Sequence, residues 1–415
     1  MIVNDKKPDT IALPGFADDA RPKVLNLSAD FPDPIDPAKT RVIRTLIDDG
    51  ADEIDHAVIS LNRISPSPAA AVRTVLTGHL GLTGVPFEHG LALGYAAPGR
   101  GLFHRTILER LGDRIASQIA NMTRGPDLVA GHKLTIEGLA VRRIATRLQL
   151  PYAITVQGDT DTKILAVRPD LAPALRRVYH DARLVTFFAP WTHAAVEEKL
   201  GRRSGPVAII PCPTELDEPL PPRPGGNGLI SVFHLKSHTR KNLSAMAEAL
   251  RLAASAGAPL TLAICGGGSP EDSAAAKASA GDAPGLVFEG SLAREAVAAR
   301  MNAATGFVLP SRRETFGLVF IEALFAGLPI IYPAGQAVSG YFDDCPFAIA
   351  VPPGAPAALA AAMRTLAKEE QSLKQALAEW QGSPAAQRFT KWAIGEAYAS
   401  ALMAATGTAT GACVS

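Results

Sequence analysis

The sequence is poor in cysteine and contains no long apolar run. Its four cysteines stand far apart along 415 residues, with neither a CxxC motif nor metal-ligand spacing: Cys212, Cys265, Cys345 and Cys413. This pattern favours reduced thiols in a cytosolic compartment over a disulfide framework. No apolar stretch approaches the roughly 20 residues of a membrane-spanning helix, and the first ten residues contain no apolar signal core. We therefore expect a cytoplasmic protein, and leave open a peripheral contact with the cytoplasmic face of a membrane.

An excess of charge is also missing. Forty-one Lys and Arg residues against 40 Asp and Glu give a net charge of +1, which argues against nucleic acid as a partner. No G-x-G-x-x-G motif opens a helix in either half, which argues against an NAD-dependent oxidoreductase. What remains is a globular composition, 47% hydrophobic and 20% charged, with enough residues for two domains.

Both halves alternate short apolar strands with amphipathic helices, the pattern of parallel α/β sheets. The Pro- and Gly-rich segment 219–228 can form neither a helix nor a central strand, so it is the best linker candidate. We predict doubly wound domains over residues 1–220 and 221–385, and a last helix over 386–405 that packs back on the first domain. Two such sheets on one linker would face a cleft at the carboxyl ends of their strands.

The predicted elements can be given as ranges. Helices are expected over residues 37–48, 106–122, 136–148 and 192–200, and a further one begins at Asn242 as its N-cap. The predicted strands are 24–27, 57–61, 128–131, 153–157, 184–188 and 207–211 in the first half, and 229–233, 260–265, 286–289, 306–309, 329–332 and 347–351 in the second.

Residues 306–332 carry the most information in the chain. They read GFVLPSRRETFGLVFIEALFAGLPIIY, which predicts a buried strand, a short polar loop, an apolar helix and a second buried strand. Glu314 ends the loop and Glu322 lies in the helix. Eight residues of helix rise about 12 Å, whereas the carboxylate pairs of glycosidases lie roughly 5–9.5 Å apart. The spacing favours two independent hydrogen-bond acceptors along one extended ligand, such as a sugar nucleotide.

The start of this predicted helix offers backbone donors. The N–H groups of Phe316, Gly317 and Leu318 suit oxyanions or hydroxyls, because they have no partner inside the helix. The alternative is that Glu314 is a loop carboxylate near a positive helix end and that Glu322 lies on a solvated face. The apolar neighbours of Glu322 argue against that alternative, since they indicate a half-buried position.

Two cations precede another predicted helix. Arg240 and Lys241 lie in the segment KSHTRKN, between a predicted strand and the helix, and predict a diphosphate site together with the helix N–H groups. A solvated basic loop is the alternative. After the strand that ends at Cys265, Gly266 opens a run of three glycines that allows a phosphate or base to approach the backbone. A plain turn explains this run equally well.

The first half offers weaker candidates. Gln157 ends a predicted strand, and Asp159 and Asp161 after it mimic the DxD motif of metal-dependent sugar transferases. Because that motif belongs to a different fold, we predict no metal. His132 also ends a predicted strand and is expected to face the cleft, where a functional and a structural role are equally supported.

Two loops of the first half allow two interpretations each. Residues 30–37, DFPDPIDP, either shape an acceptor site or form a rigid connector. In residues 95–105, Arg105 stands near Leu102 and Phe103, which look exposed. That segment is either an ordinary loop or a patch that contacts anionic lipid.

The segment from Glu314 to Glu322 resembles the Glu–seven residues–Glu motif of retaining glycosyltransferase family 4, which has the GT-B fold. Its surroundings agree with this resemblance, which covers most of the second half and only the layout of the first. The matching pieces are Leu309-Pro-Ser before the motif, Ala326-Gly-Leu-Pro329 after it, Arg240-Lys241-Asn242 as a diphosphate clamp, Ile209-Ile-Pro211 before the linker, and Phe389 to Tyr398 in the helix that crosses back.

The resemblance implies an α/β protein of GT-B fold and a retaining, metal-independent hexosyl- or glycosyltransferase with no cofactor besides its UDP- or GDP-sugar donor. The acceptor would be a glycan or polyprenyl-linked glycan of bacterial polysaccharide or glycolipid synthesis. Glu314 would contact the donor sugar and Glu322 the ribose. Arg240 and Lys241 would neutralise the leaving diphosphate, and the amides of residues 316–318 would bind the donor.

The sequence departs from the family at three places. His234 stands where the family often has an arginine, Gln157 stands where it has a histidine, and residues 30–34 replace a Gly-Gly loop. A non-catalytic sugar-nucleotide-binding protein therefore remains as an alternative. A nucleotide-sugar 2-epimerase, which is a second enzyme class on the same fold, is another. The predicted catalytic residues are Glu314, Lys241, Arg240, Gln157 and His132, and the predicted donor-binding residues are Phe316, Gly317, Leu318, Glu322, His234 and Gly266.

Overall fold

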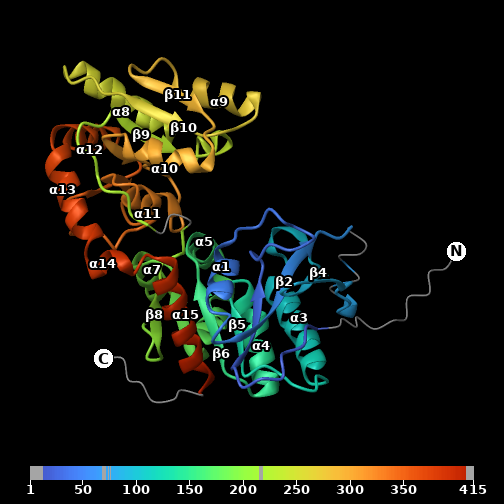
Figure 1. The fold of residues 1–415 in the computed structure, drawn as a ribbon. Coiled ribbons are helices and arrows are strands. Elements are labelled where there is room, and N and C mark those ends of the chain that lie inside the picture. Colours follow the sequence, from blue (N-terminus) through green and yellow to red (C-terminus); the bar gives the residue numbers. More distant parts are fainter. Residues whose placement is uncertain (1–12, 68–71, 73, 75, 215–217, 408–415) are drawn as a thin grey trace. The chain divides into compact units, whose positions relative to one another are not determined.

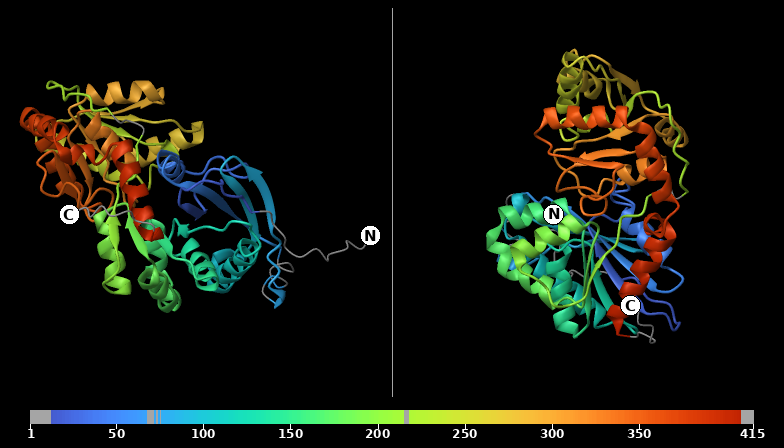
Figure 2. Two further views of the ribbon diagram at one scale, coloured as in Figure 1. Left: turned by 60° about the horizontal axis from the view of Figure 1, so that its bottom comes forward. Right: turned by 90° about the vertical axis from the view of Figure 1, so that its left-hand side faces the viewer.

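The computed structural model describes residues 13–67, 72, 74, 76–214 and 218–407. Within this part of the chain the residues form two compact units, and each is described by itself. The first unit runs to Phe188, resumes over Thr192–Ile210 and ends with the segment from Ile394 onward. The second unit contains Ala189–Trp191 and the described residues of Pro211–Ala393. In each unit a twisted sheet has helices on both faces (Figures 1 and 2).

The sheet of the first unit has the strand order β3-β4-β2-β1-β5-β6-β7-β8 over the described residues. All neighbours are parallel except β3, which runs antiparallel to β4. All six residues of β1 are buried, as expected of a central strand that helices cover on both faces. The strands are β1 Lys23–Ser28, β2 Asp55–Ile64, β3 Thr83–Phe87, β4 Gly90–Ala96, β5 Leu128–Gly131, β6 Tyr152–Val156, β7 Leu184–Phe187 and β8 Val207–Ile209.

The sheet of the second unit is parallel throughout and has the order β11-β10-β9-β12-β13-β14. In this order β9 lies between β10 and β12, so the loops that follow these three strands meet at one edge of the sheet. The strands are β9 Leu229–Val232, β10 Leu262–Cys265, β11 Leu286–Gly290, β12 Gly306–Val308, β13 Ile330–Pro333 and β14 Ala348–Val351.

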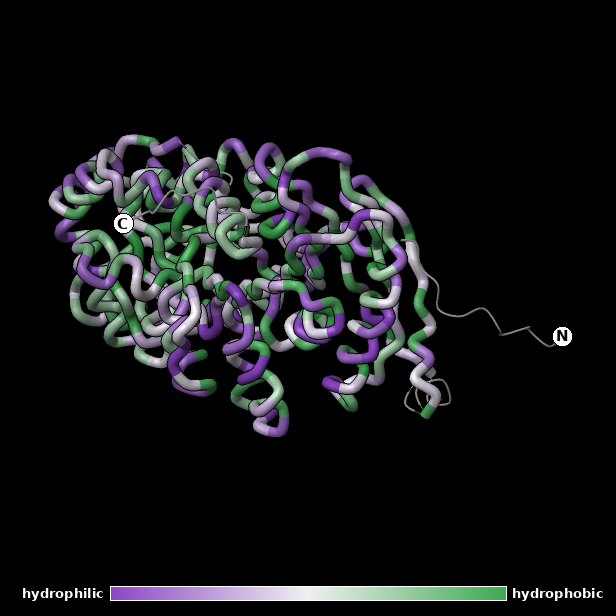
Figure 3. Tube along the Cα trace, turned by 90° about the horizontal axis from the view of Figure 1, so that it is seen from below, coloured by the Kyte–Doolittle hydropathy of each residue, from purple (hydrophilic) through white to green (hydrophobic). Residues whose placement is uncertain are grey.

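The helices bury their apolar faces against these sheets. In Figure 3 the hydrophobic stretches run through the interior of each unit, and the hydrophilic stretches lie mainly at its outside. The helices are α1 Val42–Asp49, α3 His104–Ile119, α4 Glu137–Leu148, α5 Asp159–Val167, α6 Ala172–Asp181, α7 Pro190–Leu200, α8 Leu243–Ser255, α9 Pro270–Ala280, α10 Arg294–Asn302, α11 Leu318–Phe325, α12 Pro356–Lys368, α13 Glu370–Gln381, α14 Pro384–Gln387 and α15 Lys391–Thr406.

The last helix, α15, lies in the first unit from Ile394 onward. It approaches the end of α1 closely at Gly395, where an added Cβ would lie 2.7 Å from the Cβ of Asp49. Tyr398 and Leu402 are buried on the same helix. The helix therefore completes the core of the first unit, although about 180 residues of sequence lie between β8 and α15.

Every strand that the sequence predicts is present within one or two residues at each end, apart from the wider β2. The neighbouring hairpin β3–β4 was not predicted. Its sequences, TGVPF and GLALGYA, contain glycines and Pro86, which lower strand propensity. Proline is tolerated here because β3 lies at the edge of the sheet.

The helix predicted over residues 37–48 begins only at Val42, because the preceding loop is held by Asp33. One carboxylate oxygen of Asp33 accepts hydrogen bonds from the backbone N–H groups of Ile35 and Asp36, at 2.7 and 2.9 Å. The other accepts from the side chains of Lys39, Ser60 and Asn62, at 2.7, 2.5 and 2.9 Å. These bonds fix the loop at the carboxyl ends of β1 and β2.

The segment predicted as a linker, residues 219–228, lies within the second unit. Leu220 donates a backbone hydrogen bond to Phe325, and the carbonyl of Arg223 accepts one from the ammonium of Lys374 at 2.6 Å. Proline removes backbone donors but leaves the carbonyls, and side chains of the second unit bind them here.

Three of the four cysteines, Cys212, Cys265 and Cys345, are free thiols, and Cys413 lies outside the described residues. Within the described part of the chain, the helices are too short or too polar to cross a membrane.

Candidate functional site

The centre of the candidate site is an ion pair between Lys241 and Glu314 in the second unit. Lys241 lies in the loop after β9, and Glu314 lies in the loop after β12. These strands are neighbours in the sheet, which brings the two loops together. Both side chains are largely buried, with exposed fractions of 12% and 9%. The hydroxyl of Ser311 donates to the same carboxylate oxygen of Glu314 at 3.2 Å.

A second set of hydrogen bonds holds the loop of Glu314 in place. The side-chain oxygen of Gln336 accepts from the backbone N–H of Glu314 at 2.9 Å, and its amide donates to the carbonyl of Arg312 at 3.3 Å. Trp191 donates from its indole to the carbonyls of Thr315 and Ala337, at 3.2 and 2.9 Å. The position of the carboxylate is thus set by bonds on both sides of its loop.

Asn242 connects this loop to that of Lys241. It stands at the N-cap position of α8, but its side chain does not cap the helix, in contrast to the prediction. Its backbone is left-handed, with φ of 62°, and its amide donates to the carbonyls of Pro310 and Pro353 at 3.0 and 2.7 Å. Its side-chain oxygen accepts from Arg312 at 3.0 Å. These hydrogen bonds join the loop after β9 to the segments that follow β12 and β14.

The N-terminus of α11 lies directly after Glu314. Gly317 takes the N-cap position with φ of 73°, and no side chain in the described part of the chain caps this helix. An added Cβ at Gly317 would lie 2.6 Å from the ring of Phe320, so both conformation and space require glycine. Phe316 is buried with its ring edge-on to Tyr341. The amide donors at the helix start are therefore available beside the carboxylate.

Glu322 lies one turn further along α11 and is half-buried, as the sequence indicates. It stands between Ile321 and Ala323, both fully buried. Its expected contact with a ribose stays a prediction.

The other predicted donor residues lie at the same edge of the sheet. Arg240 is exposed, and its carbonyl accepts from the backbone N–H of Arg312 at 2.8 Å. His234 is exposed and accepts a hydrogen bond at Nδ1 from the backbone N–H of Lys236 at 3.2 Å. In the neutral ring the proton is then on Nε2. Position 266 requires glycine whether or not a ligand binds there, because an added Cβ would lie 1.8 Å from the carbonyl oxygen of Phe233.

In the first unit, His132 is fully buried, which differs from the expectation that it faces a cleft. Its Nε2 lies 3.2 Å from the side-chain oxygen of Asn26, and the Asn26 amide lies 3.0 Å from Nδ1 of His56. Burial lowers the pKa of His132 to about 3 and that of His56 to about 4. Both rings are neutral in the native protein, and neither the position nor the charge of His132 suits proton exchange with solvent.

Gln157 follows β6 and is half-buried, and its side-chain amide nitrogen has no hydrogen-bond partner among the described residues. Asp161, on the first turn of α5, is fully buried. One of its oxygens accepts from the backbone N–H and the hydroxyl of Thr135, at 2.9 and 2.7 Å. Of the two acidic residues in this DxD-like sequence, Asp161 is thus committed to a hydrogen-bonded position inside the first unit.

A pocket opens at the carboxyl ends of β1, β2 and β4, where α/β sheets bind ligands. Its volume is about 350 Å³, and its lining is more apolar than polar. Glu137 lies beside it, next to the lining residue Ile136, and accepts from the backbone N–H of Ala29 at 2.5 Å. Burial raises the pKa of Glu137 to about 8, although Lys133 nearby lowers it. Glu137 is therefore mostly protonated at about pH 7.

The lining of this pocket combines small, aliphatic and aromatic side chains with two basic ones. It consists of Ala29, Leu61, Arg63, Tyr95, Ala97, Pro98, Gly101, Leu102, His104, Ile107, Leu108 and Ile136.

Comparison of whole chains shows which fold this is. The sucrose-phosphate synthase of Thermosynechococcus elongatus aligns with a TM-score of 0.64 and 18% identity, over 94% of this chain and 100% of that one. The fold is GT-B. An α,α-trehalose-phosphate synthase (UDP-forming) from Burkholderia xenovorans in complex with glucose-6-phosphate aligns with a TM-score of 0.60 and 12% identity, over 92% of this chain and 100% of that one. A structure from E. coli, bound with UDP-2-fluoro glucose, shares the GT-B fold with a TM-score of 0.62 and 11% identity, over 92% of this chain and 98% of that one.

The sequence of the GT-B protein also matches a family model, described as "Glycosyl transferases group 1", over residues 227–369. These residues lie in the second unit and include the loops of Lys241 and Glu314 and the start of α11. No curated protein sequence matches the chain. The match shows what this part of the second unit is similar to.

Sequence reasoning assigned no role to the residues that hold the site together. Gln336, Ser311 and Arg312 all contact the loop of Glu314 or lie in it. The local sequence could have indicated Ser311 and Arg312, because they stand just before the motif. Gln336 carries no local signal, since its role depends on the loop after β13 folding back over the loop after β12.

Proposed function

We propose that the protein is a retaining glycosyltransferase of the family 4 type, which transfers a hexosyl group from UDP- or GDP-sugar without a metal. The observation that carries the proposal is the joint position of Lys241, Glu314 and the uncapped start of α11 at one sheet edge. Lys241 offers a cation for the diphosphate, and Glu314 offers an acceptor for the hydroxyls of the sugar. The amide groups at the start of α11 offer donors for the oxygens that join the two parts of one sugar nucleotide.

In the proposed reaction, the bond between the anomeric carbon and the β-phosphate oxygen breaks. The acceptor hydroxyl attacks from the same face, and its proton passes to a β-phosphate oxygen. Lys241 and Arg240 compensate the charge that develops on the leaving diphosphate. Glu314 binds hydroxyls of the sugar, and Glu322 binds those of the ribose. Gln157 takes the position of the family's histidine, and its side-chain amide nitrogen has no hydrogen-bond partner among the described residues.

The acceptor side is proposed to be the first unit. Its pocket of about 350 Å³ is more apolar than polar, which favours an acceptor with an apolar part, such as a polyprenyl-linked glycan. The protein would then act in polysaccharide or glycolipid synthesis at the cytoplasmic face of a membrane. Leu102 and Phe103, 59% and 53% exposed at the pocket's edge, support a peripheral contact there.

A sugar phosphate is the second candidate acceptor. It is favoured by the structural likeness to sucrose- and trehalose-phosphate synthases, one of them in complex with glucose-6-phosphate. Arg63 in the pocket lining supplies a cation for such an acceptor.

The test begins with thermal shifts in UDP-, GDP- and ADP-sugars, because a ligand that binds the native state raises the melting temperature. Transfer from the stabilising donor is then measured for the wild type and Glu314→Ala. Transfer by the wild type with loss in the variant supports the proposal. Equal activity of both proteins contradicts the site. Binding with no turnover favours a non-catalytic binding protein, and a changed sugar without transfer favours the epimerase.

A further inference from the structure

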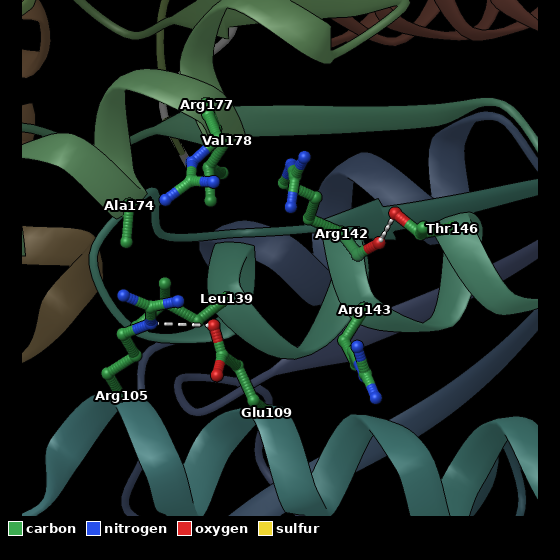
Figure 4. Close-up of a pocket in the computed structure, with 9 residues that line it drawn as sticks. All are labelled: Arg105, Glu109, Leu139, Arg142, Arg143, Thr146, Ala174, Arg177 and Val178. Atoms are coloured by element: carbon green, nitrogen blue, oxygen red, sulfur yellow. Dashed lines mark hydrogen bonds and ion pairs between the residues drawn. The ribbon is translucent and has the colours of Figure 1, made fainter.

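A second concave site lies among the helices of the first unit. It has a volume of about 220 Å³, which corresponds to roughly seven water molecules at the volume of liquid water. Three helices form it: α3 and α6 flank α4 (Figure 4). Its lining residues are Arg105, Glu109, Leu139, Arg142, Arg143, Thr146, Ala174, Arg177 and Val178.

The pocket has an apolar floor and a basic rim. Leu139, Ala174 and Val178 are buried beneath it. Three arginines from three different helices, Arg105, Arg142 and Arg177, surround the open space in Figure 4, whereas Arg143 points away from them. Arg143 is held elsewhere, because it donates to Asp113 at 2.8 Å.

Close packing of two helices fixes this arrangement. At Gly112 an added Cβ would lie 2.6 Å from the carbonyl oxygen of Ala140, so α3 and α4 approach as closely as their backbones allow. The arginines therefore lie on packed helices, α3, α4 and α6, and not on loops. A site on packed helices keeps its geometry when a ligand binds or leaves.

The carboxylates nearby leave part of each guanidinium unused. Arg105 donates from Nε to Glu109 at 2.8 Å, and Arg142 donates from Nε and Nη2 to Asp181 at 2.9 and 2.7 Å. Arg177 donates only to the carbonyl of Pro173, at 3.4 Å, among the described residues. Within that part of the chain, both Nη groups of Arg105 and Arg177 make no hydrogen bond, whereas Arg142 also interacts with the hydroxyl of Tyr152.

Arg105 and Arg142 are each paired with a carboxylate, whereas the charge of Arg177 has no such partner among the described residues. Unused Nη groups on separate helices can donate to different oxygens of one tetrahedral anion, which arginine forks bind well. We infer that Arg105, Arg142 and Arg177 form a binding site for a phosphate group, separate from the proposed donor site and independent of the proposed function.

The phosphate has two sources of the same chemistry. One is a soluble phosphate ester, and the other is the head group of an anionic lipid. Leu102 and Phe103 precede Arg105 by three and two residues and are largely exposed. A lipid head group at the arginines would place these apolar side chains near the acyl region, whereas a soluble ester needs no such neighbours.

The experiment measures binding of inorganic phosphate at low ionic strength by isothermal titration calorimetry, for the full-length wild type, Arg177→Ala and Arg142→Ala. Arg114→Ala is the matched control, because Arg114 is an exposed arginine on α3 outside the pocket. Phosphate bound anywhere else in the protein is unaffected by these substitutions and appears as a constant background. We expect both pocket variants to bind at least roughly tenfold more weakly, because each loses a charge-assisted hydrogen bond.

A second arm uses phosphatidylcholine vesicles with and without phosphatidic acid, and adds Arg177→Glu with Arg114→Glu as its control. Arginine-dependent binding of free phosphate supports the site with a soluble ligand. Binding to phosphatidic acid vesicles alone, lost in Arg177→Glu and kept in Arg114→Glu, supports it with a lipid ligand. If neither probe distinguishes the pocket variants from the Arg114 controls, the inference is overturned.

Discussion

Lys241 and Glu314 form an ion pair although 73 residues separate them in the sequence. Each compensates the charge of the other in the ligand-free site, where both are largely buried. Removal of one partner leaves an uncompensated charge, which costs more than the pair itself contributes. The two residues therefore have to be tested together as well as singly.

Lys241→Met and Glu314→Gln are each expected to lower kcat/KM for the donor by roughly a hundredfold or more, the magnitude typical of groups that stabilise developing charge. The double variant should lose less than the product of the two single losses, because the residues share one interaction. Steady-state kinetics measure all three. Lys236→Met is the matched control, since Lys236 is exposed on the same loop. Strictly multiplicative losses would show that the pair is not a functional unit.

Gly317→Ala should weaken donor binding and lower stability. A residue with a Cβ is strained at φ of 73°, and this Cβ would meet the ring of Phe320 at 2.6 Å and Cγ of Glu314 at 3.0 Å. The strain costs about 1–3 kcal/mol. Urea unfolding and the KM for the donor provide the two measurements. Gly354→Ala is the control, because nothing lies within 4 Å of its added Cβ. An unchanged KM in Gly317→Ala would argue against donor binding at the start of α11.

Asp33→Asn should remove a source of stability that depends on pH. Burial by itself raises the pKa of Asp33, but the hydrogen bonds from Lys39, Ser60 and Asn62 outweigh it and lower the pKa to about 2. The stabilisation is complete above the unfolded pKa of about 4 and is lost as the pH falls toward about 2, a contribution of about 2 kcal/mol.

Urea unfolding of the wild type and Asp33→Asn at about pH 7 and about pH 3 tests this. The difference between the two proteins should shrink at the lower pH. Asp36→Asn is the neighbouring control, since Asp36 is an exposed residue of the same loop. A difference that is the same at both pH values would contradict the role of the ionised carboxylate.

Glu137→Gln should have the opposite pH dependence. Burial raises the pKa of Glu137 to about 8, so the native protein binds a proton that the unfolded chain releases near pH 4. Stability is complete below about pH 4 and falls as the pH rises to about 8. Glutamine carries no charge to bury, and the variant should gain more than about 1 kcal/mol over the wild type at about pH 8. Parallel stability curves of the two proteins would show that Glu137 stays ionised.

The sequence predicted those features that depend on residues within a few positions of one another. Alternating apolar strands and helices, the loop before α11 and the half-buried Glu322 all follow from local spacing. The same reasoning failed for β3 and β4, where glycine and proline hide the strand pattern and pairing with β2 supplies the stability. It failed for His132 as well, because burial depends on what covers the residue.

By itself, the sequence determined that the chain is an α/β protein and that Glu314 lies just before the start of a helix. Only the tertiary structure decided what Glu314 contacts. The order β10-β9-β12 places the loop after β9 against the loop after β12, and so joins Lys241 to Glu314. The three arginines of α3, α4 and α6 come together in the same way. Strand order and helix packing arise from burial of the whole core, which no short stretch of sequence encodes.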